Sequence, residues 1–178
     1  VIANPPFSQN YKRADLKFDG RFHTFMPETG KKADLMFVQH MIAVLKPKGR
    51  MAVIMPHGVL FRGGEEGAIR KNLIENDHLE TIIGLPPNIF FGTGIPTTIL
   101  ILRQKRKNSD VLIVDASKGF AKEGKNNKLR ASDIKKIADT VIGRVTVPRY
   151  SRLVPKSELQ ENDYHLNIPR YVDSSDSA

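Results

Sequence analysis

The residues with the clearest chemical capacity are Asn4-Pro5-Pro6-Phe7, close to the start of the sequence. They follow three apolar residues, 1–3, that are typical of a short strand. Proline fixes its own φ and pushes the residue before it into an extended conformation, so the two prolines make a stiff segment. The Asn4 side-chain oxygen and a proline carbonyl then offer two acceptors, and Phe7 offers a flat apolar face. This set suits a planar heterocycle that carries an NH₂ group.

The elements that must position these groups follow from the hydrophobic pattern. In 33–46, Leu35, Val38 and Met41 share one helical face, and Asp34 suits the first turn of that helix. A run of apolar residues at 49–56 predicts a strand that is buried on both faces of a sheet. Strands are predicted at 1–3, 49–56, 78–86, 97–105 and 111–117, and helices at 33–46, through Ile69 and Leu73, and at 131–145.

This alternation of strands and helices predicts an α/β fold with a mixed sheet and flanking helices. The ten residues between 78–86 and 97–105 are too few for a parallel crossover, so these two strands are expected to run antiparallel. Residues 8–32 show no clean period and are predicted to form a long loop. The lysine-rich segment 118–130 is predicted to be a second loop, followed by an amphipathic helix that Ser132 caps.

The chain is expected to have two parts and no internal repeat. Residues 1–117 would form the sheet with its site, and 118–178 would add the basic loop, the amphipathic helix and a Pro-punctuated extension. That extension would pack on the first part or on partner subunits, and its acidic end is expected to be frayed.

Composition restricts the partners. The formal net charge of +9, from 28 Lys and Arg against 19 Asp and Glu, favours a polyanion such as nucleic acid. The sequence has no cysteine, which excludes a disulfide framework and a thiolate nucleophile. No apolar run reaches the ~18 residues of a membrane helix, so we expect a soluble, cytoplasmic protein. The histidines lack the paired spacing of a metal site and are expected to be structural or solvated: His23, His40, His57, His78 and His165.

The tetrapeptide is similar to the [Asn/Asp/Ser]-Pro-Pro-[Tyr/Phe] motif of amino-methyltransferases that use S-adenosylmethionine. The likeness extends over nearly the whole chain, from Val1 to about Val172. The sequence resembles the modification (M) subunit of type I restriction-modification systems, which methylates adenine N6 in DNA. The blocks that carry this resemblance are "DLMFVQHMIAVLKPKGRMAVIMPHGVLFRGGEEGAIRKNLIEN", "IIGLPPNIFFGTGIPTTILIL" and "NIPRYV".

The resemblance implies roles for individual residues. Asn4 and the Pro6 carbonyl would accept hydrogen bonds from the adenine amino group, and Phe7 would stack on the base. Pro5 belongs to the same catalytic motif, and Phe90 and Phe91 would line the base pocket or, equally, belong to the core. The target base would have to leave the helix, because N6 inside a duplex is paired.

The family's S-adenosylmethionine-binding half is expected to precede this sequence, which would make the fold a partial Rossmann-like methyltransferase fold. Asn4 would adjoin the cofactor, and most of its other contacts would lie in that amino-terminal half. The Gly-rich pieces "RGGEEG" and "GTGIP" are predicted to be loops, because neither opens a helix directly after a strand. The strand at Val1, Ile2 and Ala3 would then expose an edge able to pair with a second copy.

The basic clusters are candidates for DNA backbone contact, with a solvated surface as the competing interpretation. The partners implied are double-stranded DNA, a specificity (S) subunit that reads the sequence and a restriction (R) subunit. Two alternatives remain open: a protein-glutamine or RNA amino-methyltransferase, and a non-catalytic module that docks onto partner subunits. The candidate contacts are Arg103, Lys105, Arg106, Lys107, Lys125 and Lys128.

Overall fold

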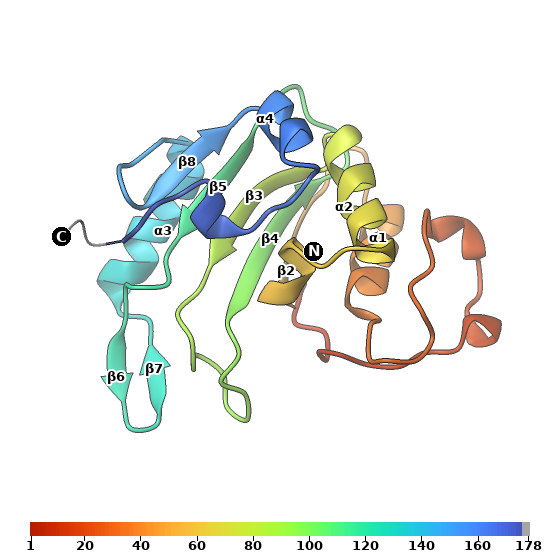
Figure 1. Cartoon of the computed structure of the whole chain (residues 1–178), viewed down its shortest axis with the longest axis horizontal. Helices are drawn as coiled ribbons and strands as arrows, with labels where there is room; N and C mark the ends of the chain where they lie inside the picture. Colours follow the sequence, from red (N-terminus) through yellow and green to blue (C-terminus); the bar gives the residue numbers. More distant parts are fainter. Residues whose placement is uncertain (176–178) are drawn as a thin grey trace.

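A six-stranded mixed sheet forms the centre of the structure, a computed structural model that describes residues 1–175 (Figure 1). Its strands follow the order β1-β2-β4-β3-β5-β8, and β6 and β7 form a separate hairpin. The strands are β1 (Ile2–Ala3), β2 (Arg50–Pro56), β3 (Leu79–Gly84), β4 (Thr97–Arg103), β5 (Val111–Asp115), β6 (Ala121–Glu123), β7 (Asn126–Lys128) and β8 (Ser151–Val154). The helices are α1 (Asp34–Val44), α2 (Glu65–Glu75), α3 (Ala131–Gly143) and α4 (Lys156–Glu161), with 3-10 turns at Arg13–Asp15, Asp19–Arg21, His57–Leu60 and Ile168–Arg170.

The directions of the strands define two ends of the sheet. β1 runs parallel to β2, and β3 runs parallel to β5. β4 is antiparallel to both β2 and β3, as the short connection between β3 and β4 predicted. The carboxyl ends of β1, β2, β3 and β5 therefore meet at one end of the sheet, which we call the carboxyl edge. The opposite end, where these four strands begin and β4 ends, is the amino edge.

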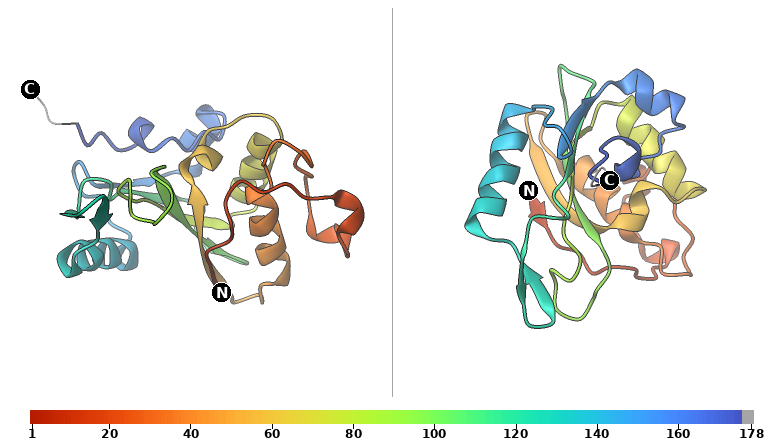
Figure 2. Two further views of the ribbon diagram at one scale, coloured as in Figure 1. Left: turned by 90° about the horizontal axis from the view of Figure 1, so that it is seen from below. Right: turned by 60° about the vertical axis from the view of Figure 1, so that its left-hand side comes forward.

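Helices cover both faces of the sheet (Figure 2). α1, α2 and the carboxyl-terminal segment lie on one face and bury the larger core, in which Leu35, Val38 and Leu159 are almost fully enclosed. α3 lies on the other face, where Ile137 and Val141 pack against the smaller core around Leu112 and its neighbours. β8 pairs with β5, so residues after 118 extend the same sheet.

The expectation that residues 49–56 are buried on both faces is wrong. Met51, Val53 and Met55 are fully buried, whereas Ala52 and Ile54 on the other face are only partly covered. The reason is that α3 packs over β5 rather than over β2. The strand is therefore covered by helices on one side only.

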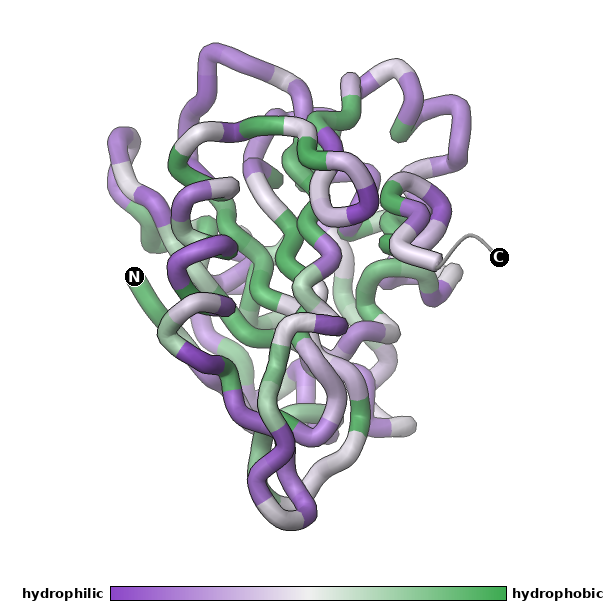
Figure 3. Tube along the Cα trace, turned by 90° about the vertical axis from the view of Figure 1, so that its left-hand side faces the viewer, coloured by the Kyte–Doolittle hydropathy of each residue, from purple (hydrophilic) through white to green (hydrophobic). Residues whose placement is uncertain are grey.

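The predicted loop at 118–130 is instead an antiparallel hairpin in which Lys122 pairs with Asn127. Its tip is hydrophilic, whereas the strands of the main sheet are largely hydrophobic (Figure 3). The helix that follows is not capped by Ser132. It begins at Ala131, and the Asp133 carboxylate accepts a hydrogen bond from the Arg130 backbone N–H at 2.9 Å.

The long segment 8–32 is irregular as predicted, apart from its two 3-10 turns. Tyr11 donates its backbone N–H to the Glu28 carbonyl at 3.2 Å, which closes this segment on itself. Among the helices that the structure describes, none has the length and apolar content needed to cross a membrane. The predicted frayed end falls partly on 176–178, which lie outside the described residues.

Candidate active site

Asn4-Pro5-Pro6-Phe7 leaves β1 at the carboxyl edge of the sheet, which is the end where open α/β sheets bind ligands. Asn4 and Pro6 are exposed, and Pro5 and Phe7 are half-buried. Within residues 1–175, neither the Asn4 side-chain amide nor the Pro6 carbonyl has a hydrogen-bond partner. Both predicted acceptors are therefore free to bind a ligand that donates hydrogen bonds.

The chain that follows the motif is held by the start of α1. The Ser8 backbone N–H donates to the Asp34 Oδ1 at 2.9 Å, and the Ala33 N–H donates to the Gln9 carbonyl at 3.1 Å. The Gln9 side-chain amide in turn donates to the Phe7 carbonyl at 2.9 Å. These contacts fix the direction in which the motif leaves the sheet.

Asp34 is the positioning residue that the sequence alone did not reveal. Its position at the start of a helix predicted only a favourable interaction with the helix dipole. The structure shows that its side chain is 1% exposed and lies with its Oδ2 3.7 Å from the Arg62 guanidinium. Arg62 also contacts the buried Glu66 at 2.9 Å, so one half-exposed arginine offsets two buried carboxylates. Nothing in the local sequence indicates this contact, because Ser8, Asp34 and Arg62 meet only in the folded chain.

His57 follows β2 at the same edge. Its backbone N–H donates to the Pro96 carbonyl at 3.1 Å, and its ring meets Phe61 edge-on with centroids 5.4 Å apart. Burial lowers the pKa of His57, and the charge of Asp115 opposes this shift only in part. The ring is therefore held neutral near neutral pH.

The loop between β3 and β4 carries the two predicted pocket aromatics to the carboxyl edge. Phe90 is half-buried, whereas the Phe91 side chain is 92% exposed. The β6–β7 hairpin supports this loop, because Asn127 donates its backbone N–H to the Asn88 carbonyl at 2.8 Å and its side-chain amide to the Pro87 carbonyl at 2.7 Å. Figure 1 shows the loop and the hairpin projecting side by side from the same end of the sheet.

A cavity of about 460 Å³ lies between this loop and the hairpin. Phe91 and Lys128 both line it, which brings an exposed ring and a cation together. The structure therefore places Lys128 next to Phe91 and Lys125 in the turn of the same hairpin, at the edge of the sheet that carries Asn4.

The other predicted DNA contacts do not lie at this edge. Arg103 is the last residue of β4, and Lys105, Arg106 and Lys107 follow it, so all four lie at the amino edge, opposite the Asn4 motif. The prediction that Arg106 contacts DNA is wrong, because its side chain is 5% exposed and turned into the fold. It donates hydrogen bonds to the Leu79 and Asp110 carbonyls at 2.5 Å each. Burial also lowers the pKa of Arg106. Arg106 is a structural residue of the fold.

No metal centre is found in the part of the chain that the structure describes, where no group of three or more His, Cys, Asp or Glu residues converges. The Gly-rich piece "RGGEEG" is a loop only in its first half. Gly64, with φ of +65°, immediately precedes α2, and Glu65 to Gly67 form its first turn. Since this helix follows a 3-10 turn rather than a strand, the segment is not a dinucleotide-binding turn.

Comparison with known proteins gives a consistent assignment. The sequence model of the family described as N-6 DNA Methylase matches residues 1–178. A curated relative, the type I restriction enzyme MpnII methylase subunit of Mycoplasma pneumoniae, is 35% identical over 98% of this chain and 33% of its own length. The chain thus spans about a third of the length of this relative.

Solved structures agree. The methyltransferase subunit of a type I restriction-modification system from Streptococcus thermophilus superposes with a TM-score of 0.93 and 44% identity, over 98% of this chain and 38% of that one. A protein of Listeria monocytogenes described as a class I S-adenosylmethionine-dependent methyltransferase shares the fold alone, with a TM-score of 0.52 and 20% identity over 79% of this chain and 41% of that one.

Proposed function

Since this chain belongs to the N-6 DNA methylase family, we propose that its carboxyl edge binds the amino group of a target adenine and that the complete protein methylates that group in DNA. The observation that carries this proposal is the pair of oxygens on Asn4 and Pro6 that have no partner among the described residues and lie at the carboxyl end of β1. The two N–H groups of an adenine amine match two fixed acceptors.

Under this proposal the chain acts by positioning the reacting nitrogen. The exocyclic amine of adenine is a weak nucleophile because its lone pair is delocalised into the ring. Two hydrogen bonds, one to Asn4 and one to the Pro6 carbonyl, favour a pyramidal nitrogen whose lone pair is free of the ring. Catalysis then depends on orientation and on fixed dipoles rather than on a strong base. The neutral character of both acceptors fits this mode of action.

The aromatic side chains would hold the base after it has left the duplex. Phe7 follows the acceptors directly, and its half-buried ring would stack on the adenine. Phe91 projects from the β3–β4 loop, and its exposed ring would provide a second surface. Extrusion of a base costs a few kcal/mol, which stacking and backbone contacts would offset.

S-adenosylmethionine is the cofactor that we propose, and it would supply a methyl group bound to a cationic sulfur. The described residues fit it in part. Asn4 offers an uncommitted polar group at the carboxyl end of a parallel strand, where such cofactors are found. The Gly-rich segment before α2 does not have the strand–turn–helix arrangement that would approach the cofactor closely. Contacts beyond Asn4 are therefore not assigned to this chain.

We propose double-stranded DNA as substrate, with Lys125 and Lys128 of the hairpin contacting its backbone beside the target base. The relatives' names refer to type I restriction enzymes, which favours a specificity subunit and a restriction subunit as partners. Self-association through β1, an edge strand with Val1 and Ile2 exposed, stays a prediction, as does a cytoplasmic location.

The sequence is also compatible with two other functions. A protein-glutamine or RNA amino-methyltransferase would use the same acceptors, but the family match and the named relatives favour DNA. A non-catalytic docking module would not require unpartnered oxygens at a ligand-binding edge. The free state of Asn4 and Pro6 therefore favours the enzyme.

The test is Asn4→Ala in the complete protein, with transfer of a labelled methyl group to adenine N6 in duplex DNA as the readout. Loss of one positioned hydrogen-bonding group is expected to lower kcat about 10²- to 10³-fold. Because Asn4 is exposed and unpartnered, thermal stability and assembly with partner subunits should stay unchanged.

The matched control is Asn76→Ala, an exposed asparagine at the carboxyl end of α2 that should leave transfer intact. If Asn4→Ala abolishes assembly while methyl transfer survives, the docking module replaces the enzyme as the function of this segment.

A further inference from the structure

The amino edge of the sheet holds a groove that the proposed chemistry does not use. It has a volume of about 810 Å³ and lies where β2 and β3 begin and β4 ends. Cationic side chains dominate its walls. In addition to the inward-facing Arg106, they are Lys48, Arg50, Arg103, Lys105, Lys107 and Arg144.

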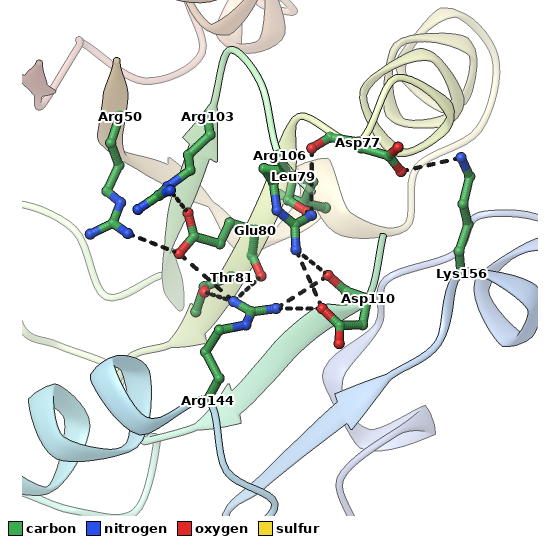
Figure 4. A network of polar contacts seen from close by, with 10 residues as sticks. All are labelled: Arg50, Asp77, Leu79, Glu80, Thr81, Arg103, Arg106, Asp110, Arg144 and Lys156. Atoms are coloured by element: carbon green, nitrogen blue, oxygen red, sulfur yellow. Dashed lines mark hydrogen bonds and ion pairs between the residues drawn. The ribbon is translucent and has the colours of Figure 1, made fainter. Parts of the chain in front are cut away.

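Three of the arginines that line this amino-edge groove are held by one carboxylate, that of Glu80 (Figure 4). Glu80 is buried, and its Oε1 lies 3.3 Å from an Arg50 nitrogen while its Oε2 lies 2.8 Å from Arg103 Nε. Arg144 approaches Glu80 at 3.8 Å from the opposite side and also donates to the Glu80 carbonyl at 3.1 Å. Three guanidinium groups are therefore fixed in orientation before any ligand arrives.

A second carboxylate, that of Asp110, also holds arginines of the groove. Asp110 lies 2.9 Å from Arg144 and 3.4 Å from Arg106. Glu80 and Asp110 pair with four arginines, while the groove is lined by seven lysines and arginines, so its charge stays positive after these ion pairs are counted. Cations clustered at this density attract an anionic ligand.

The lysines of the groove are the side chains that can bind an anionic ligand. Lys48, Lys105 and Lys107 are exposed and make no hydrogen bond or ion pair within the described range 1–175. Lys105 and Lys107 flank the buried Arg106, so alternate side chains point outward. Free lysines beside oriented arginines offer both point charges and planar donors to an anion.

The lining of the groove favours phosphate over a protein surface. Its only apolar lining residue is Pro47, whereas stable protein interfaces have a buried aromatic or aliphatic centre. Interfaces with nucleic acid are more polar and strongly positive, which is what the groove presents. Arginine is also the preferred partner of phosphate oxygens because its donors match their geometry.

We propose that the amino-edge groove is a second binding site for a DNA phosphodiester backbone, separate from the site that takes the target base. β2 spans seven residues, which is about 20 Å at the usual rise of a strand. The groove is therefore too far from Asn4 to contact the phosphates beside an extruded base. It binds phosphates of the DNA that flanks the target site. The inference rests on the proposed function only for the identity of the polyanion.

The experiment compares Lys105→Gln/Lys107→Gln with the wild type in the complete protein. Binding of two probes is measured against salt concentration: a short duplex that covers only the target site, and a long duplex with extended flanks. The matched control is Lys71→Gln/Lys135→Gln, which removes the same charge from exposed positions on α2 and α3.

For the long duplex, loss of two phosphate contacts is expected to lower the slope of log K against log salt by about 2. The short duplex should bind, and be methylated, as the wild type does. The control variant should match the wild type with both probes.

An unchanged slope with the long duplex overturns the proposal. If the slope is unchanged and assembly with a partner subunit is weakened, the groove binds an acidic protein surface instead. The failure of the proposed function would look different: Asn4→Ala would then keep its methyl transfer, whatever the salt slope of the groove variant.

Discussion

At the amino edge of the sheet, Glu80 and Asp110 fix the arginines that surround them, whereas at the carboxyl edge the oxygens of Asn4 and Pro6 have no partner in the part of the chain that the structure describes. Both edges are polar and both are built from the ends of the same strands. They differ in how far their hydrogen-bonding groups are satisfied within the protein.

This difference indicates what each edge contributes. Polar groups that are paired inside the fold stabilise it, because leaving a buried donor or acceptor unpaired is costly. Exposed polar groups without a partner contribute little to stability and are available to a ligand. Substitutions at the carboxyl edge should therefore change the reaction, and substitutions deep in the amino edge should change the stability.

The largest effect is expected from Asp34→Ala, which should change both the rate of the reaction and the stability of the fold. Asp34 is buried and holds the Ser8 backbone, so its loss frees the chain that follows the motif and leaves an amide unpaired. A displacement of about 1 Å at a reacting centre lowers the rate about 10²-fold, and loss of the buried hydrogen bond costs about 1–3 kcal/mol of unfolding free energy. A methyl-transfer assay measures the change in rate, and urea denaturation measures the change in unfolding free energy.

The matched variant is Asp34→Asn, which keeps an acceptor for Ser8 while removing the charge beside Arg62. It should recover most of the rate. Equal rates for Asp34→Ala and Asp34→Asn would show that Asp34 does not position the motif.

A smaller effect, confined to stability, is expected from Arg106→Ala. The buried guanidinium satisfies the Leu79 and Asp110 carbonyls, and its removal leaves both without this donor. The unfolding free energy should fall by about 1–3 kcal/mol, while methyl transfer per folded molecule stays unchanged. Lys105→Ala, the exposed neighbour, is the control and should unfold as the wild type does. Reduced transfer by a fully folded Arg106→Ala protein would show that buried residues of the amino edge also contribute to the reaction.

The smallest effect is expected from Phe91→Ala, and it should appear in the reaction alone. The ring is 92% exposed, so its loss removes almost no packing. Stacking on a base contributes about 1–3 kcal/mol, and the lower value of about 1 kcal/mol is expected for this almost fully exposed ring, which corresponds to a rise in KM for DNA of roughly 5-fold. Ile142→Ala, at another exposed apolar side chain, should have no effect on KM. A loss of stability in Phe91→Ala without any change in KM would assign the ring to the fold.

The carboxyl edge was more predictable from the sequence than the amino edge, because its main groups are consecutive. Asn4 and Phe7 belong to one tetrapeptide, and the strand before it fixes the edge at which it lies. The groups around Glu80 come from segments distant in sequence, so no local pattern indicates them. The basic run 103–107 therefore predicted one DNA contact surface, while the fold turns Arg106 inward.

The hairpin at residues 121–128 was missed for a different reason. Each of its strands has three residues, which is too short for hydrophobic alternation to show, and its lysines favour a loop. Gly124, with φ of +63°, allows the tight turn between them. Support from the Asn127 contacts to the β3–β4 loop is a tertiary effect.

The central claim, that Asn4 and the Pro6 carbonyl hold the amino group of an extruded adenine, is tested most directly by removing the amino group itself. The measurement compares binding of a duplex with adenine at the target position and of a duplex with purine there, by the wild type and by Asn4→Ala. The wild type should bind the adenine duplex more tightly, and Asn4→Ala should lose most of that preference, because one of the two acceptors is gone. A preference that is as large in Asn4→Ala as in the wild type would contradict the account.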